Sequence, residues 1–230
     1  KLLMHPTNSN IMFAATTVGL LKTTDGWNTW STVQSGNFRD IEFKPGDPST
    51  VYAVSTNTFY KSTNTGTSFS VISSGLPTGE SRIAIAVTPA NANYVYYLAG
   101  PGGFSTMSTS PNILEGSTGG GGSGDQSWYD LAIAVDQTNA NNVVSGGVNV
   151  FRSTDGGVNH VNSAHWVIGG QYVHADIHDL VYNPLNNNLY CGSDGGISVS
   201  TDHGVTWNNI WDGLGIMQLY RIAGVDSNPN

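Results

Sequence analysis

Charge is scarce in this sequence of 230 residues, and most of it is negative. Charged residues make up 10% of the chain, and eight Lys and Arg stand against sixteen Asp and Glu, which gives a net charge of -8. No basic cluster is present, so the composition argues against nucleic acid or an anionic membrane surface as a partner. The composition does not exclude cations or basic molecules as partners.

Cysteine and long apolar runs are also missing. Cys191 is the only cysteine, which excludes an internal disulfide framework. In the stretch "NLYCGSD" it is expected to be a small buried strand residue and not a catalytic thiol. No apolar run reaches the length of a membrane span, so direct membrane insertion is not expected.

Gly, Ser, Thr and Asn are abundant instead, as in short strands joined by tight turns. An alternating strand followed by a Pro/Asn turn occurs six times. The turns fall at intervals of 39 to 48 residues, which is the range of a propeller blade, and they are marked by Asn8, Asp47, Asn91, Asn139, Asn186 and Asn228. This period predicts an all-β propeller of four-stranded antiparallel blades, with a β-sandwich as the alternative.

The predicted propeller is a single domain, 1–230, with about five visible blades, and it is expected to be part of a larger propeller in a longer chain. The approximate blades are 1–34, 35–79, 80–127, 128–171 and 172–218, with 219–230 starting another. The third unit carries a Gly-rich loop, 116–124, where a repeated turn is expected. We interpret this loop as native.

A second phrase recurs in register with the strands: "KTTDGWNTW" (22–30), "KSTNTGTSF" (61–69), "RSTDGGVNH" (152–160) and "VSTDHGVTW" (199–207). A residue needed for one reaction has no reason to recur in every unit, whereas a turn does, so the phrase predicts a structural turn. Its residues are Asp25, Gly26 and Trp30; Asn64, Gly66 and Phe69; Asp155 and Gly157; and Asp202, Gly204 and Trp207. In the first copy Trp27 holds the usual Gly place, which suggests a different geometry there.

These phrases resemble Asp-box (BNR) repeats. The stretch "YVHADIHDLVYNPLNNNLYCGSDGGISVSTDHGVTW" resembles the sortilin-type Asp-box propellers of large secreted, modular bacterial proteins. The resemblance covers nearly the whole chain and implies a secreted or cell-surface location. It does not select a function, because such propellers include sialidases, xyloglucan-type glycosidases, receptors and assembly factors.

The face opposite the repeated turns is the predicted ligand-binding face. Aligned first strands bring five charged residues to one equivalent position around the axis, either as a salt-bridged ring or as solvated charges. They are Asp40, Arg82, Asp130, Asp179 and Arg221. Nearby aromatic residues could stack on a sugar or a peptide, and they are Trp128, Tyr129, Tyr172 and Tyr220.

Two functions fit these residues. The first is a non-catalytic module that binds a protein or glycan ligand, for example in adhesion. The alternative is a glycoside hydrolase of the xyloglucan type, for which Asp130 and Asp179 could supply two carboxylates. A sialidase would need three arginines clustered around the carboxylate of its ligand. The chain has only four arginines, of which Arg152 lies in a repeated turn, and it has no Phe/Tyr-Arg-Ile-Pro segment, so a sialidase is disfavoured.

The stretch "HADIHD" (174–179) holds the densest set of metal-binding side chains. In an extended strand His174, Asp176 and His178 would project from one face, with Asp194 brought near by the following turn. This set suggests a zinc ion if both imidazoles bind, or calcium if oxygen ligands dominate. The alternative is that these side chains only hydrogen-bond to neighbouring loops.

Overall fold

A computed structural model describes residues 1–76, 82–100, 103–105, 127–167 and 170–215. Apart from one 3-10 turn, η1 (Pro89–Asn91), the regular structure of these residues is antiparallel β. The prediction of an all-β propeller is confirmed, and the sandwich is excluded. Within the same ranges, no helix has the length and apolarity to span a membrane.

The strands form five consecutive sheets with no crossover between them. The first two are β1 (Leu2–Met4), β2 (Met12–Ala15), β3 (Gly19–Thr23) and β4 (Ser31–Ser35), then β5 (Phe38–Lys44), β6 (Asp47–Ser55), β7 (Phe59–Ser62) and β8 (Ser70–Ile72). The third is β9 (Arg82–Val87), β10 (Val95–Gly100) and β11 (Gly103–Ser105). The last two are β12 (Ala132–Val135), β13 (Val143–Gly146), β14 (Val150–Ser153) and β15 (Val161–Ala164), then β16 (Ile177–Tyr182), β17 (Leu189–Ser193), β18 (Gly196–Ser200) and β19 (Asn208–Asn209).

Among the described residues, four blades have all four strands, not the five that were predicted. The sheet of β9, β10 and β11 has three described strands. The rest of the expected third unit, including the Gly-rich loop, lies outside the described residues, as does the strand expected after residue 218.

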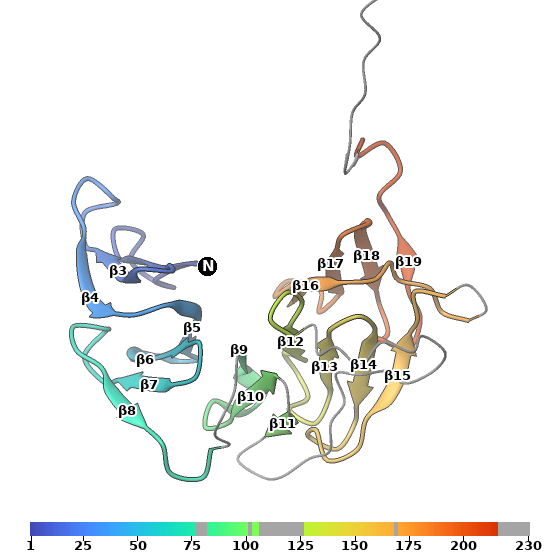
Figure 1. Ribbon diagram of the computed structural model, residues 1–230, viewed down its shortest axis with the longest axis horizontal. Coiled ribbons are helices and arrows are strands. Elements are labelled where there is room, and N and C mark those ends of the chain that lie inside the picture. Colours follow the sequence, from blue (N-terminus) through green and yellow to red (C-terminus); the bar gives the residue numbers. More distant parts are fainter. Residues whose placement is uncertain (77–81, 101–102, 106–126, 168–169, 216–230) are drawn as a thin grey trace, which may run out of the picture.

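The sheets follow one another in an arc around a common axis, with the N-terminal sheet and the β16–β19 sheet at its two ends (Figure 1). The first strand of each sheet lies closest to the axis. Each pair of neighbouring sheets shares an apolar cluster, so both faces of the inner strands are buried. The four clusters include Phe13 with Ile41, Val54 with Ile83, Leu98 with Ile133, and Val144 with Ile177.

All four acid-phrase turns close with the same hydrogen bonds. In the sheet of β16 to β19, which is the fifth blade in chain order, Asp202 Oδ1 accepts from Ser200 Oγ and from the Thr206 backbone N–H, both at 2.8 Å. The Gly204 N–H donates back to Ser200 Oγ at 2.8 Å. The turns of Asp25, Asn64 and Asp155 repeat this pattern.

Each of these turns also has two consecutive residues with left-handed φ. In the fifth blade they are His203 and Gly204, at 60° and 80°. In the first blade they are Gly26 and Trp27, at 69° and 71°, so the expectation of a different geometry was wrong. The covering aromatic residue does vary, since Trp207 is 7% exposed whereas Trp30 is 63% exposed.

The repeated turns share one edge of the blades with the turns that join first to second strands. Backbone hydrogen bonds connect the two, from Gly26 N to the Asn10 carbonyl at 3.1 Å and from Gly156 N to the Asn141 carbonyl at 2.9 Å. We call this edge the box face. The opposite edge carries the second-to-third turns and the segments that lead into each first strand, and we call it the entry face.

Candidate functional site at the entry face

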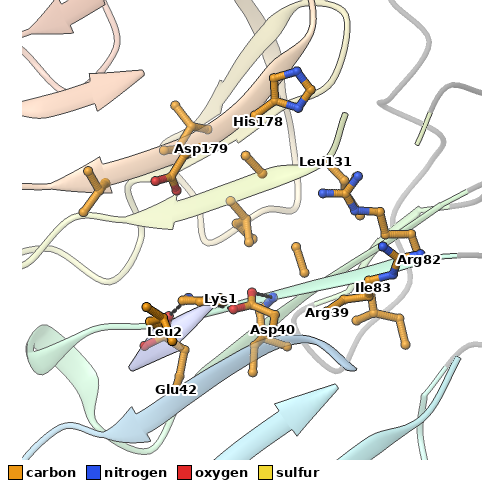
Figure 2. A pocket seen from close by; sticks show the side chains of 16 residues that line it. Lys1, Leu2, Arg39, Asp40, Glu42, Arg82, Ile83, Leu131, His178 and Asp179 are labelled. Carbon is orange, nitrogen blue, oxygen red and sulfur yellow. Dashed lines mark hydrogen bonds and ion pairs between the residues drawn. The ribbon is translucent and has the colours of Figure 1, made fainter. Parts of the chain in front are cut away.

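A cavity of about 570 Å³ lies on the axis, between the inner strands. Residues of β5, β9, β12 and β16 line it, together with Leu2, the first residue of β1, and Lys1 before it (Figure 2). Two arginines, Arg39 and Arg82, lie at one end, and the carboxylates of Asp40, Glu42 and Asp179 lie further along it. The cavity therefore has a cationic end and an acidic end.

Two β-bulges explain why consecutive residues both face this cavity. In a regular strand neighbouring side chains point to opposite faces. The pairing of β5 with β6 shifts between Phe38 and Asp40, and that of β16 with β17 shifts between Ile177 and Asp179. Each bulge redirects one extra side chain, Arg39 in β5 and its equivalent His178 in β16.

Lys1 neutralises the acidic end. Its Nζ lies 2.6 Å from Asp40 Oδ1 and also pairs with Glu42. Burial alone would lower the pKa of Lys1, but these two carboxylates outweigh it and the pKa rises. Asp40 also accepts the backbone N–H groups of Ile41 and Ile85, each at 2.8 Å.

The predicted ring of alternating Asp and Arg salt bridges does not form among the described residues. Asp40 pairs with Lys1 and not with Arg82. Arg82 Nη1 instead donates to the carbonyls of Trp128 and Tyr129, at 3.2 and 2.5 Å. Arg82 and Asp179 line the cavity, whereas Arg221 lies outside the described residues.

Asp130 departs furthest from the predicted ring, because it is 1% exposed and does not line the cavity. Burial, and then the nearby carboxylate of Asp176 through charge repulsion and a hydrogen bond, raises its pKa to about 7. Asp176 itself has a left-handed φ of 64°, which is uncommon for a residue other than Gly. A carboxyl group that is half protonated at neutral pH therefore lies beneath the entry face.

Tyr129, His178 and Asp194 form a cluster on the entry face. His178 Nε2 lies 2.6 Å from Asp194 Oδ1, and the Tyr129 hydroxyl lies 3.0 Å from Asp194 Oδ2. The Tyr129 and His178 rings meet edge to face with centroids 4.8 Å apart. Trp128 lies beside Tyr129 with a centroid distance of 5.7 Å and is 65% exposed.

The predicted metal site is assembled only in part. His178 and Asp194 are adjacent, as expected. Residues 174–176 precede β16 and Asp176 has a left-handed φ, so the alternation that would align His174 with His178 does not hold. His174 Nδ1 lies 3.1 Å from the carbonyl oxygen of Ala175. Within the described ranges, no group of three or more His, Cys, Asp or Glu side chains is arranged to hold a metal ion.

Tyr172 lies apart from the Trp128 and Tyr129 pair, and its ring meets Trp211 edge to face at 6.2 Å. Tyr220 lies outside the described residues. Sequence reasoning missed Lys1, Arg39, Glu42 and Trp211. Arg39 directly precedes a predicted site residue, but only the bulge, which the sequence does not reveal, turns it toward the cavity.

No protein-family model matches the chain, and no curated protein does. Solved structures do resemble its fold. One is a family GH74 xyloglucanase from Xanthomonas campestris, with a TM-score of 0.61 and 17% identity over 90% of this chain and 38% of that one. Another is an auxiliary nutrient binding protein from Bacteroides thetaiotaomicron, with a TM-score of 0.53 and 11% identity over 84% and 56%. A third is PorZ, a surface component of the type-IX secretion system of Porphyromonas gingivalis, with a TM-score of 0.53 and 14% identity over 91% and 26%.

At these identities the likeness shows the fold alone, and the fold is a β-propeller. The chain spans less than two thirds of each of these structures. The similar propellers include an enzyme, a nutrient binding protein and a surface component. The resemblance to Asp-box and sortilin-type propellers stays a prediction.

Proposed function

We propose that this chain is a non-catalytic binding module of a secreted or cell-surface protein, and that it holds a glycan or protein ligand on the entry face. The observation that carries the proposal is the exposed aromatic pair of Trp128 and Tyr129 beside the mouth of the charged cavity. Flat aromatic surfaces beside hydrogen-bonding groups suit sugar rings as well as peptide side chains.

The contacts of this pair support a preformed surface. Arg82 donates hydrogen bonds to the backbone carbonyls of both residues, and the Tyr129 hydroxyl donates one to the Asp194 carboxylate. Trp128 therefore projects from an anchored segment, and little conformational entropy is lost when a ligand stacks on it. The nutrient binding protein and PorZ are consistent with this role, through fold alone.

A glycoside hydrolase is the second candidate, because Asp130 has a pKa of about 7 and could donate a proton at neutral pH. Its burial and its hydrogen bond to Asp176 argue against that role. Paired carboxyls in glycosidases flank the substrate at about 5 to 9.5 Å and do not bond to one another. Catalysis would need acids from elsewhere in a longer chain.

Affinity electrophoresis and calorimetry with a panel of neutral and acidic glycans, xyloglucan among them, test the proposal. Wild-type protein should bind at least one glycan, and Trp128→Ala should weaken that binding about tenfold or more, as expected for the loss of an aromatic contact. Trp30→Ala is the matched control, since Trp30 is equally exposed on the box face. Release of reducing ends from xyloglucan would favour the hydrolase, and equal binding by both Trp variants would refute the proposed site.

A further inference from the structure

Two arginines share the cationic end of the cavity (Figure 2). Arg39 comes from β5 and is exposed, and Arg82 comes from the neighbouring inner strand β9 and is half-buried. Burial lowers the pKa of Arg82, and the positive charge of Arg39 lowers it further. The two guanidinium groups therefore repel one another in a partly desolvated position, where screening is weak.

The charges of Asp130 and Asp40 offset part of this repulsion, but neither forms an ion pair with an arginine. Within the described residues, neither arginine has an ion-pair partner within 4.0 Å. Asp40 is the nearest acid on the same strand as Arg39, but it is already bonded to Lys1 and two backbone N–H groups. Asp130 is partly protonated at neutral pH. This end of the cavity thus carries an excess of positive charge in a protein whose net charge is -8.

Arg82 is also oriented. Its Nη1 donates to the backbone carbonyls of Trp128 and Tyr129, which fixes the plane of the guanidinium. Among the described residues, the other N–H groups of this guanidinium have no hydrogen-bond partner and are available to a ligand. The same two bonds place the guanidinium next to the backbone of Trp128, whose indole is 65% exposed. The anchored guanidinium and the segment that carries the exposed indole therefore lie together at the cavity mouth.

We infer that this mouth binds a carboxylate-bearing glycan, with a uronate group between Arg39 and Arg82 and a sugar ring stacked on Trp128. The inference rests on the proposed function and names its ligand class. Guanidinium groups match the planar, two-oxygen geometry of a carboxylate, and the bound anion would remove the repulsion between the arginines. An acidic peptide would satisfy the arginines but would make less use of the indole face, so we favour the glycan.

The test compares trigalacturonate with its methyl ester, in which each carboxyl group loses its charge and gains one methyl group. Calorimetry at 150 mM NaCl uses wild type, Arg39→Gln, Trp128→Ala and Arg152→Gln. Arg152 lies on the third strand of the fourth blade and is the matched arginine control. We expect the acid to bind about tenfold or more tightly than the ester, as charge-assisted hydrogen bonds allow, and Arg39→Gln to abolish this preference while Arg152→Gln keeps it.

Arg39 is exposed and its charge repels Arg82, so its substitution should not lower the melting temperature, and circular dichroism checks that the variant is folded. Equal binding of acid and ester, or a preference that survives Arg39→Gln, would overturn the inference. Binding of a hexaglutamate peptide without binding of either saccharide would overturn it as well. Neutral glycans that bind through Trp128 with no dependence on Arg39 would refute the uronate site and leave the proposed function standing. A complete lack of glycan and protein binding would refute both the uronate site and the proposed function.

Discussion

Two buried aspartates flank β12, and their pKa values shift in opposite directions. Asp130 precedes the strand and is 1% exposed, and Asp136 follows it and is fully buried. Burial, then the charge of Asp176, raises the pKa of Asp130 to about 7. Burial acts on Asp136 too, but hydrogen bonds from Asn142, Asn187 and Thr138 outweigh it and lower its pKa to about 2. We predict that Asp130→Asn removes a pH dependence of stability that comes from the Asp130 carboxyl, whereas the titration of the Asp136 carboxyl contributes none between pH 5 and pH 8.

The magnitude follows from proton linkage. Between about pH 4 and pH 7 the folded protein keeps a proton on Asp130 that the unfolded chain has lost, so the free energy of unfolding falls as pH rises. One pKa unit corresponds to about 1.36 kcal/mol, and integration from pH 5 to pH 8 gives a loss of about 2.5 kcal/mol. The amide in Asp130→Asn does not titrate, so the variant should lack this loss.

Urea denaturation at pH 5, 6, 7 and 8 measures the effect. The other groups titrate alike in both proteins, so the difference between variant and wild type isolates Asp130. It should grow by about 2.5 kcal/mol from pH 5 to pH 8, or about 5 to 10 °C in melting temperature for a domain of this size. Asp136→Asn should destabilise throughout this range, since that carboxyl is ionised in both states, and any change of the loss with pH would come through its pairing partner His203, whose Nδ1 lies 2.7 Å from Asp136 Oδ2. If Asp130→Asn keeps the pH dependence of the wild type, the reasoning is refuted.

Three further predictions concern the scaffold. Asp202→Ala should lower the free energy of unfolding by about 1 kcal/mol or somewhat more, as the loss of a turn cap does, and leave ligand binding intact; loss of binding in a folded variant would contradict a structural role. Gly66→Ala should cost about 2 kcal/mol, because φ is +66° and the new methyl group would overlap the ring of Phe13 in the neighbouring blade. Gly46→Ala, with φ +74° and open space around it, should cost only about 1 kcal/mol, and equal losses would contradict the packing argument. Cys191 is fully buried, and burial raises its pKa to about 12, so a thiol reagent should label it only after denaturation.

The sequence predicted the blades because their information is local and repeated. The spacing of the strand turns and the acid phrase depends on residues a few positions apart, such as Ser200 and Asp202, whose hydrogen bond recurs in each copy. Even the unusual first copy keeps the geometry, with Trp27 adopting the left-handed φ that Gly has elsewhere. The number of complete blades was predicted less well, because the third unit departs from the repeat.

The site was harder to predict because it is made by contacts between distant residues. Lys1 meets Asp40 and Glu42 across two blades, and no local pattern connects them. The expected alternation of His174 and His178 failed at a residue with left-handed φ, and Arg39 faces the cavity because of a bulge. Both are single-residue departures from regular strand geometry, which a periodic pattern cannot reveal.

The box face and the entry face therefore differ in how well they tolerate substitutions. On the box face, the same short turn recurs in four blades and also reaches the neighbouring blade, as when Trp207 Nε1 donates to Ser163 Oγ at 2.8 Å. A substitution there disturbs both a turn and an interface between blades. On the entry face the connections differ: only two residues join β4 to β5, whereas the segment from β15 to β16 runs over 165–176 and carries the exposed Trp166. Variation in these segments leaves the repeated hydrogen bonds intact, so ligand specificity can change at the cavity mouth without loss of the fold.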